Sequence, residues 1–163
     1  MHKPNAIDAA VDKALADWGI PFSARYMGED DRDPDPERAI MDHWHVTVGK
    51  YRTDFYTGIG LRGPTPAPAA GRPAPRRGTL AHEQLERQRK PVKPTAAAVL
   101  HCLLADAEAV DMSFYDWAGN LGYNGDSIKD RATYDACCEC GWAMRREFTR
   151  SQMDELRDLL QDY

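Results

Sequence analysis

The chain has 163 residues, of which 42% are hydrophobic and 29% charged, and its formal net charge is −5. These values are typical of one soluble globular domain with a modest core, so we expect residues 1–163 to form a single domain. They exclude an integral membrane protein, because no stretch approaches the ~20 consecutive apolar residues of a membrane span. No signal peptide opens the chain, so we expect a cytoplasmic protein without a membrane partner.

The charges are segregated along the chain. Residues 61–94 hold eight Lys or Arg and two Glu, which gives +6, so the other residues must carry −11 for the total to be −5. Seven of the eleven prolines also fall in this stretch. It has too few apolar side chains to offset the entropy of ordering. We interpret it as a basic Pro/Arg-rich insertion, either a solvated linker or an interaction segment.

Helical and strand periodicities together predict an α+β fold. Residues 7–18 repeat hydrophobic side chains at helical spacing, which predicts an N-terminal helix. A short strand is expected over residues 22–27. Residues 43–57 alternate hydrophobic and polar side chains on both sides of a turn at residues 49–50, which predicts two more strands. We expect a small three-stranded antiparallel sheet, followed by a C-terminal bundle of about four helices over residues 95–162.

Residues 28–42 form an acidic loop with seven acids and two arginines. Its Asp-x-Asp-x-Asp pattern, from residue 31, imitates the start of a calcium-binding loop. The sixth position is Pro36 and the twelfth is Asp42, where an EF-hand needs glycine and a bidentate glutamate. We therefore interpret residues 28–42 as a proline-stiffened acidic surface loop.

Local start signals divide the C-terminal part into helices. Thr95 is a suitable N-cap, and Ser113 and Ser127 each stand three residues before an aspartate, as in a capping box. A last helix is predicted to begin at Ser151. Its apolar side chains are expected to cover Trp142 of the preceding helix.

Aromatic and turn residues are concentrated in residues 112–148. Helical spacing assigns one set of them to core packing: Phe114, Trp117, Leu121, Tyr134 and Cys137. The rim of this stretch is left for a partner: Tyr115, Asn120 and Tyr123.

Two sets of potential metal ligands occur in the sequence. His43 and His45 share a strand face, but no third ligand stands at a readable spacing, so we prefer polar cover of the solvent face. The other set lies in predicted helices: His101, Cys102, Cys137, Cys138 and Cys140. Its spacing is not the C-x₂-C knuckle of zinc ribbons. We interpret these cysteines as small buried apolar residues that stay reduced in the cytoplasm, and we predict no cofactor.

No catalytic residue set is found in the sequence. There is no Gly-rich phosphate loop, no nucleophile elbow and no His-Glu-x-x-His motif. The many acids are not paired on any element that suggests a pocket. We therefore do not expect an enzyme.

Five motifs occur in a specific order and spacing: Tyr-Thr-Gly-Ile-Gly at residues 56–60, Pro-Thr-x₃-Val-Leu-x-Cys-Leu-Leu from residue 94, Ser-Phe-x-Asp-Trp at 113–117, Gly-Tyr-x₂-Asp-Ser at 122–127 and Tyr-x₂-Cys at 134–137. Through them about half of the chain resembles a widespread group of small uncharacterised bacteriophage and prophage proteins. The chain departs from this group in its long connection between Gly60 and Pro94 and in its tail beyond Arg146. The resemblance implies a mobile-element origin and the cytoplasm of a bacterial host.

That origin favours two hypotheses. The first is a non-enzymatic inhibitor that binds a host defence protein or complex, such as a CRISPR effector, and competes for its basic nucleic-acid channel. Its candidate contacts are the loop acids and the rim: Asp30, Asp31, Asp33, Asp35, Glu37, Tyr115, Asn120 and Tyr123. The second is a nucleic-acid-associated phage accessory protein that uses the insertion: Arg72, Arg76, Arg77, Arg87, Arg89 and Lys90. A structural phage component is a third reading, for which a large homo-oligomer is expected.

Overall fold

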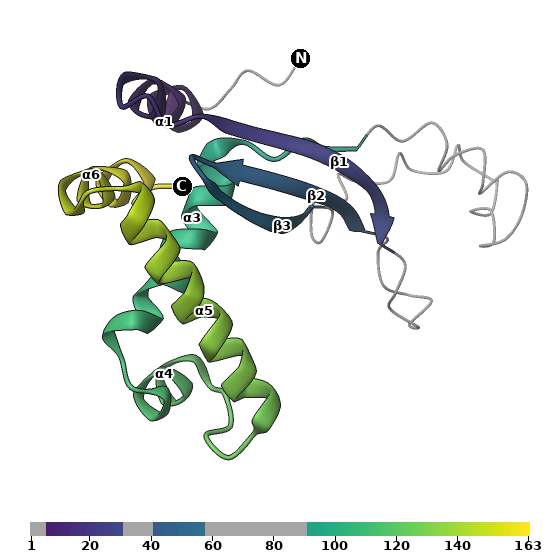
Figure 1. Cartoon of the computed structure of the whole chain (residues 1–163), viewed down its shortest axis with the longest axis vertical. Coiled ribbons are helices and arrows are strands. Elements are labelled where there is room, and N and C mark those ends of the chain that lie inside the picture. The colour runs from purple at the N-terminus through teal and green to yellow at the C-terminus, as the bar shows by residue number, and fades with distance from the viewer. Residues whose placement is uncertain (1–5, 31–40, 58–90) are drawn as a thin grey trace, which may run out of the picture. The chain divides into compact units, whose positions relative to one another are not determined.

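The computed structural model describes residues 6–30, 41–57 and 91–163. The chain folds as α+β, with an N-terminal helix, a three-stranded antiparallel sheet and C-terminal helices, as the sequence predicts. The described elements are, in order (Figure 1), α1 (Ala6–Asp17), β1 (Phe22–Asp30), β2 (Met41–Val48), β3 (Tyr51–Thr57), α3 (Ala96–Ala107), η1 (Glu108–Asp111), α4 (Phe114–Leu121), α5 (Ile128–Glu147) and α6 (Arg150–Leu160). Among these described helices, none is long and apolar enough to cross a bilayer.

Packing divides the chain into two compact units. The helical unit contains residues 1–23, 46–53 and 94–163, and the sheet unit contains residues 24–45 and 54–93. The boundary runs through all three strands, so the turn between β2 and β3 belongs to the helical unit. The prediction of a single domain is not tested by this division and stays a prediction.

The three strands lie in the order β1-β2-β3. β2 alternates between half-buried and buried residues along its whole length, and its buried residues are Asp42, Trp44, Val46 and Val48. Successive side chains of a strand point to opposite faces, so the alternation read from the sequence is confirmed. The turn to β3 needs a left-handed residue, and Gly49 supplies it with a φ of 61°.

Both ends of the predicted acidic loop belong to strands, because residues 28–30 lie in β1 and residues 41 and 42 lie in β2. Asp42 is not exposed, contrary to its sequence assignment. It lies in β2, and only 2% of its surface is exposed. Asp42 stands two residues before Trp44, so it shares the buried face of the strand.

Two buried side chains of the sheet unit, Trp44 and Thr57, form a short chain of hydrogen bonds. The indole N–H of Trp44 donates to Thr57 Oγ1 at 2.9 Å, and the Thr57 hydroxyl donates to the carbonyl oxygen of Val92 at 3.0 Å. A buried polar group is costly unless it is hydrogen-bonded. These bonds therefore fix the end of β3 to the chain segment at Val92.

α3 is the centre of the helical unit, because it packs on α1, α5 and α6 (Figure 1). It begins as predicted at Thr95, whose hydroxyl accepts the Ala98 N–H at 3.2 Å. A helix that is apolar on most of its circumference belongs in a core. The buried residues of α3 are Ala96, Ala97, Val99, Leu100, Leu103, Leu104 and Ala107.

Two residues that were expected in the core are exposed instead. The exposed fraction is 61% for Leu121 and 54% for Trp142. α6 packs on α1 and α3, which takes up its single apolar stripe, so the prediction that α6 covers Trp142 is wrong. α6 also begins earlier than predicted. Its N-cap is Thr149 rather than Ser151, and Gln152 closes the capping box.

Candidate functional site

The residues predicted as partner contacts fall largely outside the described part of the chain. Asp30 is the last residue of β1, whereas Asp31, Asp33, Asp35 and Glu37 lie outside the described residues. The six basic residues of the nucleic-acid hypothesis also lie outside the described residues: Arg72, Arg76, Arg77, Arg87, Arg89 and Lys90. The structure describes three predicted contacts: Tyr115 and Asn120 belong to α4, and Tyr123 follows its end.

A small aromatic cluster holds α4 against the start of α5. Phe114 and Trp117 are buried, as predicted, and Tyr134 packs against them. The Tyr123 ring stacks on Trp117 with centroids 4.6 Å apart and an interplanar angle of 5°. The Tyr134 hydroxyl donates to the carbonyl oxygen of Met112 at 2.7 Å. The surface above this cluster is therefore supported by rigid packing.

Large hydrophobic side chains are exposed on α4, in the loop after it and at the first residue of α5. The exposed fraction is 70% for Tyr115, 61% for Leu121, 42% for Tyr123 and 89% for Ile128. Asn120, between them in sequence, is also exposed, and its amide contacts the Met112 sulfur at 3.7 Å. We name these residues the exposed rim: Tyr115, Asn120, Leu121, Tyr123 and Ile128. Exposed apolar side chains that form one patch on a soluble protein commonly mark an interaction site.

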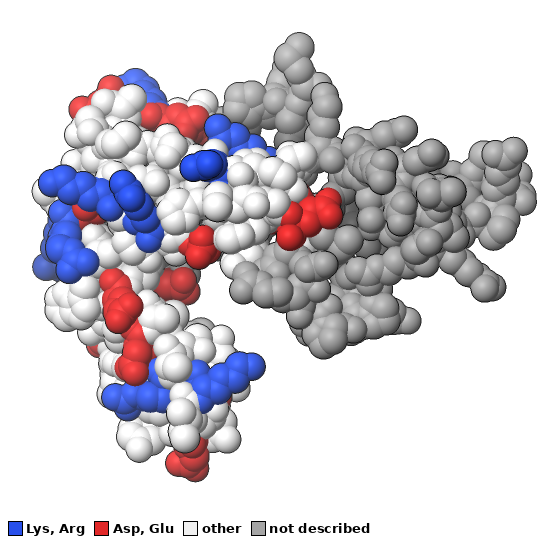
Figure 2. Space-filling model, turned by 45° about the vertical axis from the view of Figure 1, so that its right-hand side comes forward, with Lys and Arg blue, Asp and Glu red and all other residues white. Residues whose placement is uncertain are grey.

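A second surface of the helical unit is basic. Figure 2 shows Lys and Arg side chains gathered on the side where the C-terminal end of α5 meets α6. A cavity of about 590 Å³ opens there, which we name the basic groove. Its lining comes from η1, the end of α5 and α6: Asp111, Arg145, Phe148, Thr149, Arg150, Met153, Asp154 and Arg157.

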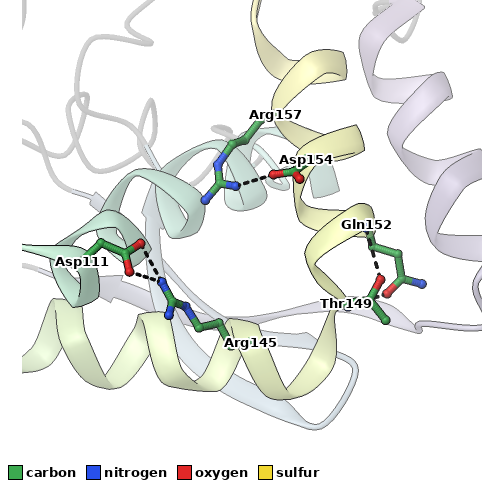
Figure 3. A network of polar contacts seen from close by, with 6 residues as sticks. All are labelled: Asp111, Arg145, Thr149, Gln152, Asp154 and Arg157. Carbon is green, nitrogen blue, oxygen red and sulfur yellow. Dashed lines mark hydrogen bonds and ion pairs between the residues drawn. The ribbon is translucent and has the colours of Figure 1, made fainter.

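Two ion pairs fix guanidinium groups in the basic groove. Arg145 of α5 donates to both carboxylate oxygens of Asp111 at 2.6 Å, and Arg157 donates to Asp154 at 3.0 Å. Figure 3 shows Arg145 and Arg157 pointing from their two helices toward the same space. Because a guanidinium has five donors, each arginine keeps N–H groups for a further acceptor.

A smaller hollow lies on the other side of the last turn of α5. Its volume is about 390 Å³, and it is lined by Lys50, Tyr51, Arg52, Ala143, Arg146 and Glu147. The backbone N–H of Lys50 donates to Glu147 Oε2 at 2.8 Å, which ties the β2–β3 turn to α5. Neither hollow was predicted from the sequence. The smaller one combines Lys50 and Arg52 with Arg146 from a distant segment, whereas the arginines of the basic groove lie close together in the chain, at residues 145, 150 and 157.

The predicted histidine pair shares a carboxylate. His43 Nε2 lies 3.0 Å and His45 Nδ1 lies 3.2 Å from the same oxygen of Asp54 on β3. Hydrogen bonds to His43 and then His45 hold the pKa of Asp54 below its usual range. Among the described residues there is no group of three or more side chains that could hold a metal ion. The interpretation of the pair as polar cover of this face stays a prediction.

The cysteines of the helical part are free thiols in different environments. Cys102 is exposed, so its interpretation as a buried residue is wrong. Cys140 is buried, and its thiol donates to the carbonyl oxygen of Leu103 at 3.6 Å. Burial raises the pKa of both Cys137 and Cys140 to about 11. The thiolate is the nucleophile and the metal ligand, so these two thiols are poorly reactive near neutral pH.

Alkaline pH is expected to destabilise the protein through these thiols. In the unfolded chain they ionise near pH 8.5, and in the folded chain near pH 11. The raised pKa stabilises the fold fully below about pH 8.5, and this contribution is lost as pH rises through about 11. Burial raises the pKa of Tyr51 to about 12, so the loss of stability continues to higher pH.

Urea unfolding at a series of pH values between about 7.5 and 10.5 measures this loss in the free energy of unfolding. Cys140→Ala should show a shallower fall in the free energy of unfolding with pH than the wild type does. Cys138→Ala, which removes a half-buried thiol from the same helix, is the matched control. A wild-type slope in the Cys140 variant would contradict this account.

The helical unit thus presents two surfaces of different chemistry: the apolar exposed rim and the basic groove. Both are built by described residues of one unit, α4 and α5 in the first case, η1, α5 and α6 in the second. Comparison with known proteins found no matching family model, no matching curated protein and no matching solved structure.

Proposed function

We propose that this chain is a non-enzymatic binding protein of mobile-element origin that inhibits a bacterial defence system, such as a CRISPR effector, by docking its exposed rim on a defence protein. One observation carries the proposal. Four large hydrophobic side chains are exposed around α4 and the start of α5: Tyr115, Leu121, Tyr123 and Ile128.

Energetics support a protein partner for the exposed rim. Burying such side chains is favourable by about 25 cal/mol for each Å² of apolar surface removed from water. Tyrosine is enriched among residues that dominate binding energy, since it is large and has few rotatable bonds. Tyr123 is already held by its stacking on Trp117, so little further entropy is lost when it binds.

The resemblance to phage and prophage proteins supports the direction of the proposal. The motif at residues 122–127 specifies Tyr123, and Tyr115 occupies the variable position of the motif at residues 113–117. A host-defence target is the partner class that such an origin favours. The loop acids Asp31, Asp33, Asp35 and Glu37 remain proposed electrostatic contacts of the same partner.

The test is an interference assay in bacteria that carry a CRISPR effector and a targeted plasmid, repeated for a panel of defence systems. Co-expression of the wild-type chain should restore plasmid establishment against one system, and the chain should co-purify with that system's effector. The double variant Tyr115→Ala/Ile128→Ala should bind that effector at least about tenfold more weakly, since hot-spot side chains contribute 2 kcal/mol or more.

The matched control is Met27→Ala/Tyr163→Ala, which removes two exposed hydrophobic side chains outside the rim. It should retain wild-type inhibition. If no system in the panel is inhibited, the inhibitor proposal is wrong. If inhibition is found but the rim variant inhibits as well as the control does, the rim is not the docking surface.

The second candidate function is a nucleic-acid-associated phage accessory protein, which the charge segregation favours. The proposed contacts are the basic residues of the insertion: Arg72, Arg76, Arg77, Arg87, Arg89 and Lys90. Binding of random DNA or RNA through them should weaken steeply as salt rises, because counterions are released. Neutralising all six together should abolish a mobility shift that depends on the insertion.

A further inference from the structure

We propose that the basic groove, together with the last turn of α5, binds the phosphate backbone of a single-stranded nucleic acid, with Trp142 as a stacking platform for a base. This surface is distinct from the exposed rim. It also lies outside the Arg-rich insertion, so its test is independent of the tests of both proposed functions.

The first argument is local charge. Six cations line the groove and the neighbouring hollow: Lys50, Arg52, Arg145, Arg146, Arg150 and Arg157. They face three acids, whereas the whole chain carries −5. Asp111 and Asp154 are each paired to one arginine. Among the described side chains, no carboxylate pairs with Lys50, Arg52, Arg146 or Arg150. A basic surface kept on an acidic protein is the electrostatic footprint of a polyanion site.

The second argument is the position of the cations on both sides of α5. Arg145 lines the basic groove and Arg146 lines the smaller hollow. Adjacent helical residues point about 100° apart, so the two guanidinium groups leave α5 in different directions. Arg150, just beyond the end of α5, continues the positive surface into the groove. A chain with a charge at regular intervals can contact all of these cations as it crosses α5, which a single small anion cannot do.

The third argument is Trp142. Its indole is more than half exposed, which is costly for the largest apolar side chain. It stands three residues before Arg145 and four before Arg146, so its side chain lies between theirs on the surface of α5. The Arg145 guanidinium lies over the Trp142 ring, 5.4 Å from its centroid.

An exposed aromatic ring among backbone-binding cations is the combination with which proteins bind single strands. A duplex keeps the faces of its bases stacked inside, and an acidic peptide has no base to stack. The ring therefore favours a single strand over both.

The experiment measures fluorescence anisotropy of a labelled oligo(dT) of about 12 nucleotides with the full chain, over a series of salt concentrations. The groove variant is Arg146→Gln/Arg150→Gln. The matched control, Lys13→Gln/Lys129→Gln, removes the same charge from exposed positions elsewhere. All four residues are exposed, so each variant should keep its fold, which circular dichroism verifies.

We expect the groove variant to bind at least about tenfold more weakly than the control. Its slope of log affinity against log salt should be shallower by about 1.4, because single strands contribute about 0.7 for each neutralised phosphate. Trp142→Ala should weaken binding by about fivefold or more without changing this slope. The same losses should occur in a chain whose six insertion residues are already neutralised.

Three results would overturn the proposal. The first is no binding of the oligonucleotide at low salt, or equal binding by the groove and control variants. The second is tighter binding of a duplex of the same length. The third is that poly-glutamate competes as well as unlabelled oligonucleotide does and that Trp142→Ala does not change binding. This result would assign the surface to an acidic protein partner.

Discussion

Gly141→Ala is expected to destabilise the protein by about 2 kcal/mol, even though alanine is the better helix former. A Cβ on Gly141 would lie 2.3 Å from Val110 Cγ2, 2.9 Å from the carbonyl oxygen of Ala107 and 3.2 Å from Ala107 Cα. Two of these atoms belong to the backbone and cannot rotate away, so α5 would have to move off α3 and η1. Overpacking costs about 1–3 kcal/mol or more, which outweighs the gain of about 1 kcal/mol in helix propensity.

Gly119 provides the matched control in α4. No atom lies within 4 Å of a Cβ built there, so Gly119→Ala should stabilise the protein by about 0.5–1 kcal/mol. Thermal unfolding followed by circular dichroism measures both changes. A loss of 2 kcal/mol corresponds to a fall in midpoint of about 4–8 °C for a chain of this size. If the two substitutions shift the midpoint alike, the close approach at Gly141 is refuted.

Trp117→Ala is expected to have the largest effect of any substitution proposed, a loss of about 3–5 kcal/mol. The indole is buried and lies against three other rings, with centroid distances of 4.6 Å to Tyr123, 5.5 Å to Tyr134 and 6.3 Å to Phe114. Its removal leaves a cavity that these neighbours cannot fill, because close-packed side chains relax only partially. Tyr123 also loses its support, so partner binding through the exposed rim should fall as well.

Trp142→Ala is the control for this prediction, since it removes the same side chain from an exposed position. The expected loss is about 0.5–1 kcal/mol, from the contact with Arg145. Urea unfolding followed by far-UV circular dichroism compares the variants without relying on tryptophan fluorescence. Losses of similar size in the two variants would contradict the burial described for Trp117 and the exposure described for Trp142.

Several elements could be predicted from the sequence because their causes are local. The hydroxyls of Ser113 and Ser127 accept the N–H of Asp116 and Asp130, both at 3.2 Å, as their spacing predicts. The alternation in β2 follows from the two-residue repeat of any strand. Phe114 and Trp117 are buried because one helical stripe faces a neighbour.

The exposed side chains of the candidate sites were predicted less well. Tyr115, Asn120 and Tyr123 were identified by elimination, since they were left after the other residues had been assigned to the core or to helix initiation. Leu121 was assigned to the core because its spacing continues the apolar stripe of α4, but α4 ends there and Gly122 turns the chain away with a φ of 75°. Spacing along a helix does not show where the neighbour that covers it stops.

The sequence by itself determined the class of the fold, the helix starts and the faces of β2, because these depend on residues close together in the chain. The tertiary structure decided which apolar stripe is covered, and so left Trp142 exposed while Gly141, one residue earlier, lies at a helix crossing. It also assembled a basic groove in a chain of net charge −5, from residues of η1, α5 and α6. The net charge of a chain does not determine the charge of one surface, because folding decides which side chains line each hollow.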